Sequence, residues 1–172
     1  GLAAVELGAL MGARVIAAAS SEEKLETCKR FGAEYTINYA KHDLREALRK
    51  IVGNNGVDVV YDPVGDKYEA PAVRSLAWGG RFLVVGFAAG EIPKIPLNLL
   101  LLKGASIVGV FWGNFSQREA VANANNNATL VRWIASGRLK PLISATYSLD
   151  QVPQALDDIS NRKVQGKVVV VP

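Results

Sequence analysis

Three side chains that can bind a phosphate group follow two neighbouring apolar runs of the chain. In RVIAAASSEEK, Ser20 comes directly after the first run and Lys24 stands four residues later. Tyr39 follows the second run, in EYTINY. Hydroxyl and ammonium groups hydrogen-bond and neutralise a phosphate ester, whereas a carboxylate in their place would repel it. If the two runs are parallel strands, these side chains meet at one edge of a sheet and suit a phosphorylated ribose.

Each of these residues also has a simpler interpretation. Ser20 with Glu23 matches a helix capping box, and Lys24 alone fits a solvated helix lysine. Tyr39 alone fits an aromatic residue at the end of a strand. Glu22 and Glu23 weaken the preference for a phosphate, although we expect both to point outward on the helix. The combination, with no acid directly at the strand end, favours a 2′-phosphate.

Two further turns follow apolar runs in the middle of the chain. In VDVVYDPVGD, Val64 and Gly65 come after a β-branched run typical of a central parallel strand. In VVGFAAG, Gly86, Phe87 and Ala88 come after the next run, and the glycine allows close approach of a ligand to the backbone. Ligands of open parallel sheets bind beyond the carboxyl ends of the strands, so both turns are candidate binding segments.

The elements that would position these residues alternate along the chain, as in βαβ units. Periodicity and glycine punctuation predict helices at 2–11, 22–31, 43–52, 68–76 and 116–137, and strands at 14–19, 34–39, 57–62, 105–112 and within 79–90. A capping-box match of Ser116 with Glu119 opens the long helix. Beyond residue 137 the pattern changes to strand, helix and strand. We therefore predict two units, 1–137 and 138–172.

Composition limits the class of protein. The chain has 49% hydrophobic and 21% charged residues, which is typical of a folded globular protein. Its net charge of +4 comes without a cluster of basic and aromatic residues, so a small phosphate-bearing ligand fits better than a nucleic acid. No apolar run is long enough for a membrane span. Cys28 and His42 are the only residues of their kinds, which favours a reducing, cytoplasmic setting and leaves no metal site.

Several segments, in this order, resemble the medium-chain dehydrogenase/reductase superfamily. They are GLAAVELGALMGARVIAAASSEEKL, GAEYTINY, GVDVVYDPVG, GGRFLVVGFA and GKVVVVP. They are most similar to its zinc-independent NADPH:quinone oxidoreductases, the zeta-crystallin-like branch. The resemblance implies a doubly wound Rossmann-type parallel sheet whose first strand is missing. It also implies that 1–137 form an NADP-binding domain and that 138–172 belong to a GroES-like catalytic domain.

The resemblance also implies roles for individual residues. Gly1 would be the last glycine of a phosphate-binding turn, so we expect the chain to begin in mid-fold and to lack the catalytic module. Arg162 resembles an arginine that reaches the cofactor, with Lys167 a weaker candidate. The following sets would bind NADP(H): Ser20, Lys24 and Tyr39 at the 2′-phosphate, Val64 and Gly65 on the adenosine side, and Gly86, Phe87, Ala88, Phe111, Trp112 and Gly113 on the nicotinamide side.

The implied activity is NADPH-dependent hydride transfer to quinones or related conjugated carbonyl compounds. No residue of the chain is identified as a catalytic acid or base. The edge strand from Ala105 to Trp112 would pair with a second copy to form a homodimer. Two alternatives stay open: a zinc-dependent alcohol dehydrogenase of the same superfamily, whose zinc ligands lie elsewhere, and a nucleotide-binding module without turnover.

Overall fold

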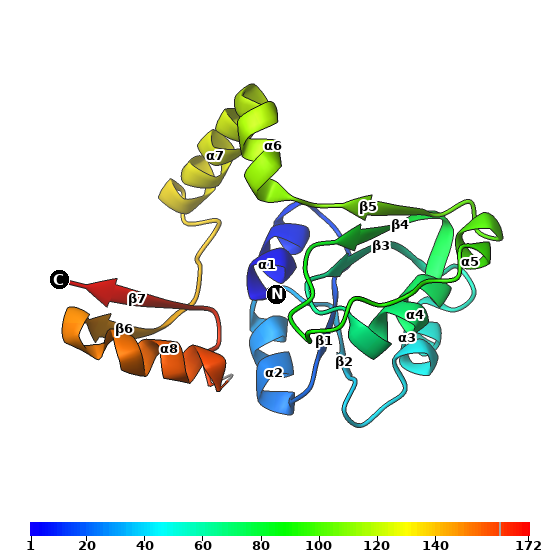
Figure 1. Cartoon of the computed structure of the whole chain (residues 1–172), viewed down its shortest axis with the longest axis horizontal. Helices are drawn as coiled ribbons and strands as arrows, with labels where there is room; N and C mark the ends of the chain where they lie inside the picture. The colour runs from blue at the N-terminus through cyan, green and yellow to red at the C-terminus, as the bar shows by residue number, and fades with distance from the viewer. Residues whose placement is uncertain (162) are drawn as a thin grey trace.

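A computed structural model describes residues 1–161 and 163–172, and it has the α/β architecture that the sequence predicts (Figure 1). Helices and strands alternate along the first part of the chain. In order they are α1 (Leu2–Leu10), β1 (Ile16–Ala19), α2 (Glu22–Arg30), β2 (Tyr35–Asn38), α3 (Leu44–Val52), β3 (Val57–Asp62), a 3₁₀ turn (Asp66–Tyr68), α4 (Glu69–Arg74), β4 (Leu76–Val84), α5 (Asn98–Leu101) and β5 (Ser106–Gly109).

The parallel sheet is divided into two groups of strands. β1 pairs with β2, with Ile16 opposite Tyr35, and β3, β4 and β5 pair in that order. Within the described residues no ladder joins β1 to β3. In a doubly wound sheet the first strand lies between the second and the fourth, which correspond here to β1 and β3. This division confirms the predicted Rossmann-type sheet without its first strand.

The rest of the chain lies outside this sheet. α6 (Trp112–Arg118) and α7 (Ala120–Ala135) project away from it, and β6 (Ile143–Ser148), α8 (Val152–Ser160) and β7 (Lys167–Val171) form a separate unit beside α1 and α2 (Figure 1). β6 and β7 are parallel and bond only to each other among the described strands. The Glu6 carboxylate of α1 accepts a hydrogen bond from the Lys140 backbone at 2.6 Å. The boundary at residue 137 stays a prediction.

Two apolar clusters hold the sheet and its helices together. The larger contains Val73, Leu76 and Phe82, all almost fully buried between α4, β4 and α5. The smaller contains Val5 and Ala17 and joins α1 to β1. Burial of such side chains is the main favourable term in folding. Both clusters lie along the strands, so they fix the strand ends where the candidate ligand-binding residues lie.

Two predictions near β5 are wrong. The strand predicted up to Trp112 ends at Gly109, and Trp112 begins α6. Phe111 is 72% exposed, so it is not a core residue of that strand. Ser116 does not cap the long helix but lies inside α6, where its hydroxyl donates to the Gly113 carbonyl at 2.8 Å. The helix is instead interrupted at Glu119, whose backbone leaves the helical region.

None of the described helices is both long enough and apolar enough to traverse a lipid bilayer.

Candidate functional site

The ends of β1 and β2 bring the first set of candidates to one edge. Ala19 lies opposite Asn38, and the Ala19 carbonyl accepts a hydrogen bond from the Tyr39 backbone at 3.1 Å. Ser20 and Tyr39 therefore leave neighbouring strands at the same level, as expected for parallel strands. Ser20 is exposed, and its hydroxyl has no hydrogen bond among the described residues.

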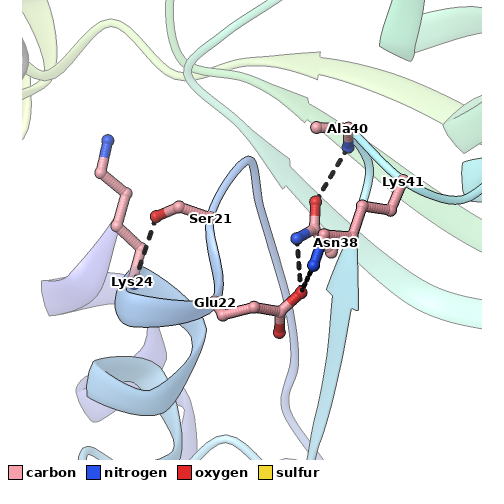
Figure 2. A network of polar contacts seen from close by, with 6 residues as sticks. All are labelled: Ser21, Glu22, Lys24, Asn38, Ala40 and Lys41. Atoms are coloured by element: carbon pink, nitrogen blue, oxygen red, sulfur yellow. Dashed lines mark hydrogen bonds and ion pairs between the residues drawn. The ribbon is translucent and has the colours of Figure 1, made fainter.

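The helix cap is one residue later than the capping-box match indicates. Ser21, not Ser20, is the N-cap of α2, and its hydroxyl accepts a hydrogen bond from the Lys24 backbone at 3.4 Å (Figure 2). Ser21 has the extended backbone that an N-cap requires. The interpretation of Ser20 as a cap is thus wrong. Its hydroxyl is available to a ligand at the strand end.

The side chains of the first turn of α2 diverge. Figure 2 shows the Lys24 side chain extending past Ser21 and away from Glu22. Glu22 instead turns toward β2, where its carboxylate accepts hydrogen bonds from Asn38 at 2.7 Å and from Lys41 at 3.0 Å (Figure 2). The hydrogen bond from Asn38, followed by that from Lys41, lowers the pKa of Glu22.

Glu22 is exposed, as expected, but its carboxylate turns toward β2 because the buried Asn38 amide donates a hydrogen bond to it. Asn38 is 5% exposed, and its side-chain oxygen Oδ1 accepts a hydrogen bond from the Ala40 backbone at 3.1 Å. Lys41 compensates the charge of Glu22, so the carboxylate is partnered on the β2 side while Lys24 extends on the other. The ammonium and the Ser20 hydroxyl are the groups left to meet an anion.

Tyr39 lies against an aromatic residue that the sequence analysis did not select. Its ring centroid is 4.4 Å from that of Tyr68, at an interplanar angle of 43°. The Lys67 ammonium lies 5.4 Å from the Tyr68 ring centroid, within the range of a cation–π contact. Tyr68 precedes α4, so this contact connects the β1–β2 end to the segment after β3.

The ends of β3, β4 and β5 form the second set. Asp62 lies opposite Val84, and Val84 lies opposite Gly109, so the three strands finish side by side. The Asp62 carboxylate accepts hydrogen bonds from the backbones of Val64 at 2.8 Å and Gly65 at 3.2 Å. Asp62 is therefore a turn former, and it orients the turn that carries both candidates.

The turns after β3 and β4 are bonded to each other. The Ala88 backbone donates to the Pro63 carbonyl at 3.1 Å, and Phe87 covers Gly65. Gly65 has a φ of +72°, and a Cβ there would lie 3.1 Å from the Phe87 ring. A glycine is required at this position both for the backbone angle and for the close approach. Val64, Gly65, Gly86, Phe87 and Ala88 thus form one surface.

The remaining candidates are less closely associated. Phe111, Trp112 and Gly113 follow β5, and the Val110 backbone donates to the Val84 carbonyl at 2.8 Å, which places them beyond the end of β4. Gly1 opens α1 and is exposed, with no described contact to the other candidates. Lys167 begins β7 in the separate unit. Arg162 lies outside the described residues.

Glu69 is the other notable residue that the sequence analysis did not select. It is 4% exposed at the start of α4, and its Oε2 atom has no hydrogen-bond partner among the described residues. Burial, and secondarily the charge of Asp62, raise the pKa of Glu69. No sequence signal distinguishes it, because an acid in the first turn of a helix is normally exposed.

The groups at the strand ends suit a dinucleotide. A hydroxyl and an ammonium are free at the first set, and glycine turns allow backbone approach at the second. Within residues 1–161 and 163–172, no three His, Cys, Asp or Glu side chains are grouped so that they could hold a metal ion.

Comparison with known proteins identifies the family. A family model described as zinc-binding dehydrogenase matches residues 1–128. The chain belongs to this family. The predicted membership of the medium-chain dehydrogenase/reductase superfamily, in its quinone oxidoreductase-like branch, is confirmed. Quinone oxidoreductase-like protein 2 of Bos taurus is 39% identical over 171 residues, which are 99% of this chain and 49% of that protein.

Other members of the family extend the comparison. The crystal structure of Escherichia coli quinone oxidoreductase complexed with NADPH is 28% identical, with a TM-score of 0.87 over 100% of this chain and 53% of that one. An NAD-dependent alcohol dehydrogenase of Saccharolobus solfataricus is 29% identical over 174 residues, covering 100% of this chain and 47% of that protein. The chain thus spans about half the length of the curated relatives that it matches.

Proposed function

We propose that the chain is the cofactor-binding part of an NADPH-dependent oxidoreductase that reduces quinones or related conjugated carbonyl compounds. The observation that carries this proposal is the arrangement after β1. Ser21 takes over the helix cap, which leaves the Ser20 hydroxyl without a hydrogen bond among the described residues, and the Lys24 ammonium extends away from the partnered Glu22 (Figure 2). A 2′-phosphate would accept hydrogen bonds from both groups. The E. coli relative, whose structure contains NADPH, supports the assignment.

The residues of this chain would bind and orient the cofactor. Ser20, Lys24 and Tyr39 would hold the 2′-phosphate, and the turn at Val64 and Gly65 would contact the adenosine. The surface at Gly86–Ala88 and the residues Phe111, Trp112 and Gly113 would contact the nicotinamide and exclude water from the reacting face. The bound dinucleotide would supply the hydride. We assign no catalytic acid or base, so the contribution of this chain is positional.

The proposal includes a homodimer and a small-molecule substrate. β5 bonds to β4 on one side, and all four of its residues are exposed. An exposed apolar strand edge is a surface on which a second copy can add its own strand. The proposed cytoplasmic location depends on the single cysteine of the sequence. The assignment of 138–172 to a catalytic domain is likewise part of the proposal.

The test replaces Lys24 with alanine in the whole protein and measures the affinity for NADPH and NADH by fluorescence. Loss of one charged hydrogen bond corresponds to a factor of about ten in the dissociation constant. We expect Lys24→Ala to weaken NADPH binding about tenfold and to leave NADH binding unchanged. Lys29→Ala, at an exposed site near the other end of the same helix, is the matched control. Equal weakening of both cofactors would contradict the 2′-phosphate assignment.

An alcohol dehydrogenase is the second candidate function, because the matching family model is described as zinc-binding and one relative is an NAD-dependent alcohol dehydrogenase. Glu22, the first residue of α2, could accept a ribose hydroxyl in that case. Metal analysis of the whole protein separates the two candidates. One zinc ion per chain together with oxidation of alcohols by NAD would favour this candidate. A protein that binds NADPH without oxidising it in a panel of quinones and enones would be a binding module.

A further inference from the structure

We propose that Gln165 is a positioning residue that clamps the segment between α8 and β7 to the first turn of α2. This inference rests on the proposed function, because it concerns the turn that carries Lys24. Gln165 lies outside the proposed cofactor site. It holds this turn of α2 at a fixed distance from the C-terminal unit, which consists of β6, α8 and β7.

The clamp uses both ends of one side-chain amide. The Gln165 nitrogen donates to the Glu23 carboxylate at 2.5 Å, and the Gln165 oxygen accepts a hydrogen bond from the Thr27 hydroxyl at 2.6 Å. Glu23 and Thr27 are one turn apart on the same face of α2. The planar amide therefore bridges two successive turns of the helix, and rotation of Gln165 would break both hydrogen bonds together.

The helix side of the clamp is rigid. Thr27 is 3% exposed, its hydroxyl lies 3.1 Å from the Glu23 carbonyl, and it accepts a hydrogen bond from Arg30 at 3.0 Å. Arg30 thus holds the Thr27 oxygen from its own helix, while the single hydroxyl proton is shared between Gln165 at the shorter distance and the Glu23 carbonyl at the longer one. A hydrogen bond to such a preorganised group loses little conformational freedom when it forms.

Around the clamp the two parts do not pack closely. A cavity of about 510 Å³ opens between α2 and the C-terminal unit, and its polar lining includes Glu26, Arg30, Ser144 and Lys163. Among the described residues, the side-chain hydrogen bonds between α2 and residues 138–172 are the two made by Gln165. Since the space beside it is open, this amide fixes the spacing between α2 and residues 138–172, together with the hydrogen bond from the Lys140 backbone to Glu6 that holds the same residues to α1.

The clamp acts on the proposed cofactor site through neighbouring residues. Glu23 stands next to Lys24 in the first turn of α2, and the Lys24 backbone is also bonded to the Ser21 cap. A shift of this turn would move the Lys24 ammonium away from the Ser20 hydroxyl. Gln165 therefore couples the position of the C-terminal unit to the geometry of the phosphate-binding groups.

The experiment exchanges the donor and the acceptor in the whole protein. Gln165→Glu places a carboxylate against Glu23, so the first hydrogen bond is replaced by repulsion. Adding Glu23→Gln to this variant restores the pattern, because an amide at 23 can donate to a carboxylate at 165 while Thr27 still donates to it. Gln117→Glu is the matched control, an equal change of charge at an exposed position of α6 where the side chain makes no hydrogen bond among the described residues.

The measurements are the melting temperature and the dissociation constant for NADPH. We expect Gln165→Glu to weaken NADPH binding about five- to tenfold and to lower the melting temperature, and the double variant to recover both. The control should change neither. A double variant that recovers the melting temperature but not the affinity would overturn the positioning role, as would a Gln165→Glu variant that matches the wild type in both measurements.

Failure of the clamp and failure of the proposed function give different results. If the wild-type protein binds no NADPH, the proposed function fails, and with it the positioning of a phosphate-binding group. The melting temperatures of the single and double variants then still report whether the bridge between residues 23 and 165 forms.

Discussion

Glu69 holds a carboxylate in surroundings that disfavour its charge. The side chain is almost fully buried, one of its oxygens has no described partner, and Asp62 adds a second negative charge nearby. The pKa of Glu69 is accordingly raised, first by burial and then by Asp62. The folded protein therefore holds the Glu69 proton more tightly than the unfolded chain does. Its contribution to stability is complete below the pKa of the unfolded state and is lost as pH rises through the folded pKa.

Replacing Glu69 with glutamine, its neutral isostere, should remove this loss of stability at high pH. We expect Glu69→Gln to raise the melting temperature of the whole protein at pH 8, and to change it less at pH 4, where both side chains are neutral. Thermal unfolding at the two pH values measures the difference. Glu91→Gln, at an exposed position, serves as the control. A Glu69→Gln variant that is less stable than the wild type at pH 8 would show that the carboxylate is stabilised by a partner.

At the start of helix α2, two adjacent serines have different roles. Ser21 caps the helix, so Ser21→Ala should destabilise the protein by about 1 kcal/mol, while Ser20→Ala should leave stability within about 0.5 kcal/mol of the wild type. The reverse holds for the ligand: Ser20→Ala should weaken NADPH binding severalfold. Denaturant unfolding and fluorescence titration of both variants test the pair. Destabilisation by Ser20→Ala instead of Ser21→Ala would place the cap where the capping-box match indicated.

Local patterns predict the elements well and their junctions poorly. The helix predicted at 43–52 is an example of success, because α3 begins after Asp43, whose carboxylate accepts a hydrogen bond from the Glu46 backbone at 2.8 Å, a contact made within one turn. The Ser20–Glu23 match failed because two adjacent serines both satisfy the motif, and only the backbone path out of β1 selects between them. The interruption at Glu119 is a single non-helical residue, which helix propensity does not encode.

The site shows the same limits. The strand-end positions of Val64, Gly65 and Gly86 follow from the alternation of elements, since parallel strands finish at one edge. The contacts that connect them do not. The Tyr39–Tyr68 pair and the Glu22–Asn38 hydrogen bond join residues from different elements, and their distances depend on how the strands and helices pack. The contacts of Gln165 could not be predicted from the sequence for the same reason, because this residue lies far along the chain from its partners on α2.

At the scale of the whole molecule, β5 is the surface on which the proposed dimer depends. Ile107 and Val108 are 36% and 39% exposed, and β4 is the one described strand that pairs with β5. An antiparallel contact between two copies of such a strand would bring Val108 of each copy close to the two-fold axis. The edge would then be closed by a second copy.

A charge at this position should prevent the association. We expect Val108→Lys to convert a dimer into a monomer, because two ammonium groups would meet at the interface, whereas Val131→Lys on the exposed face of α7 should have no such effect. Sedimentation of the whole protein gives the mass directly. A Val108→Lys protein that still sediments as a dimer would mean that another surface forms the contact.

The divided sheet has a practical consequence for anyone who prepares this polypeptide by itself. Among the strands of residues 1–161 and 163–172, β1 bonds only to β2 and β3 only to β4, so each keeps a row of amide and carbonyl groups along one side that no other strand satisfies. Such strand edges bind extended peptides, which add to the sheet as a further strand. A short β-branched peptide added in trans should therefore bind the isolated polypeptide and protect its amides from hydrogen exchange, whereas a scrambled proline-containing peptide should not. The same property would let the polypeptide serve as one half of a split-protein reporter.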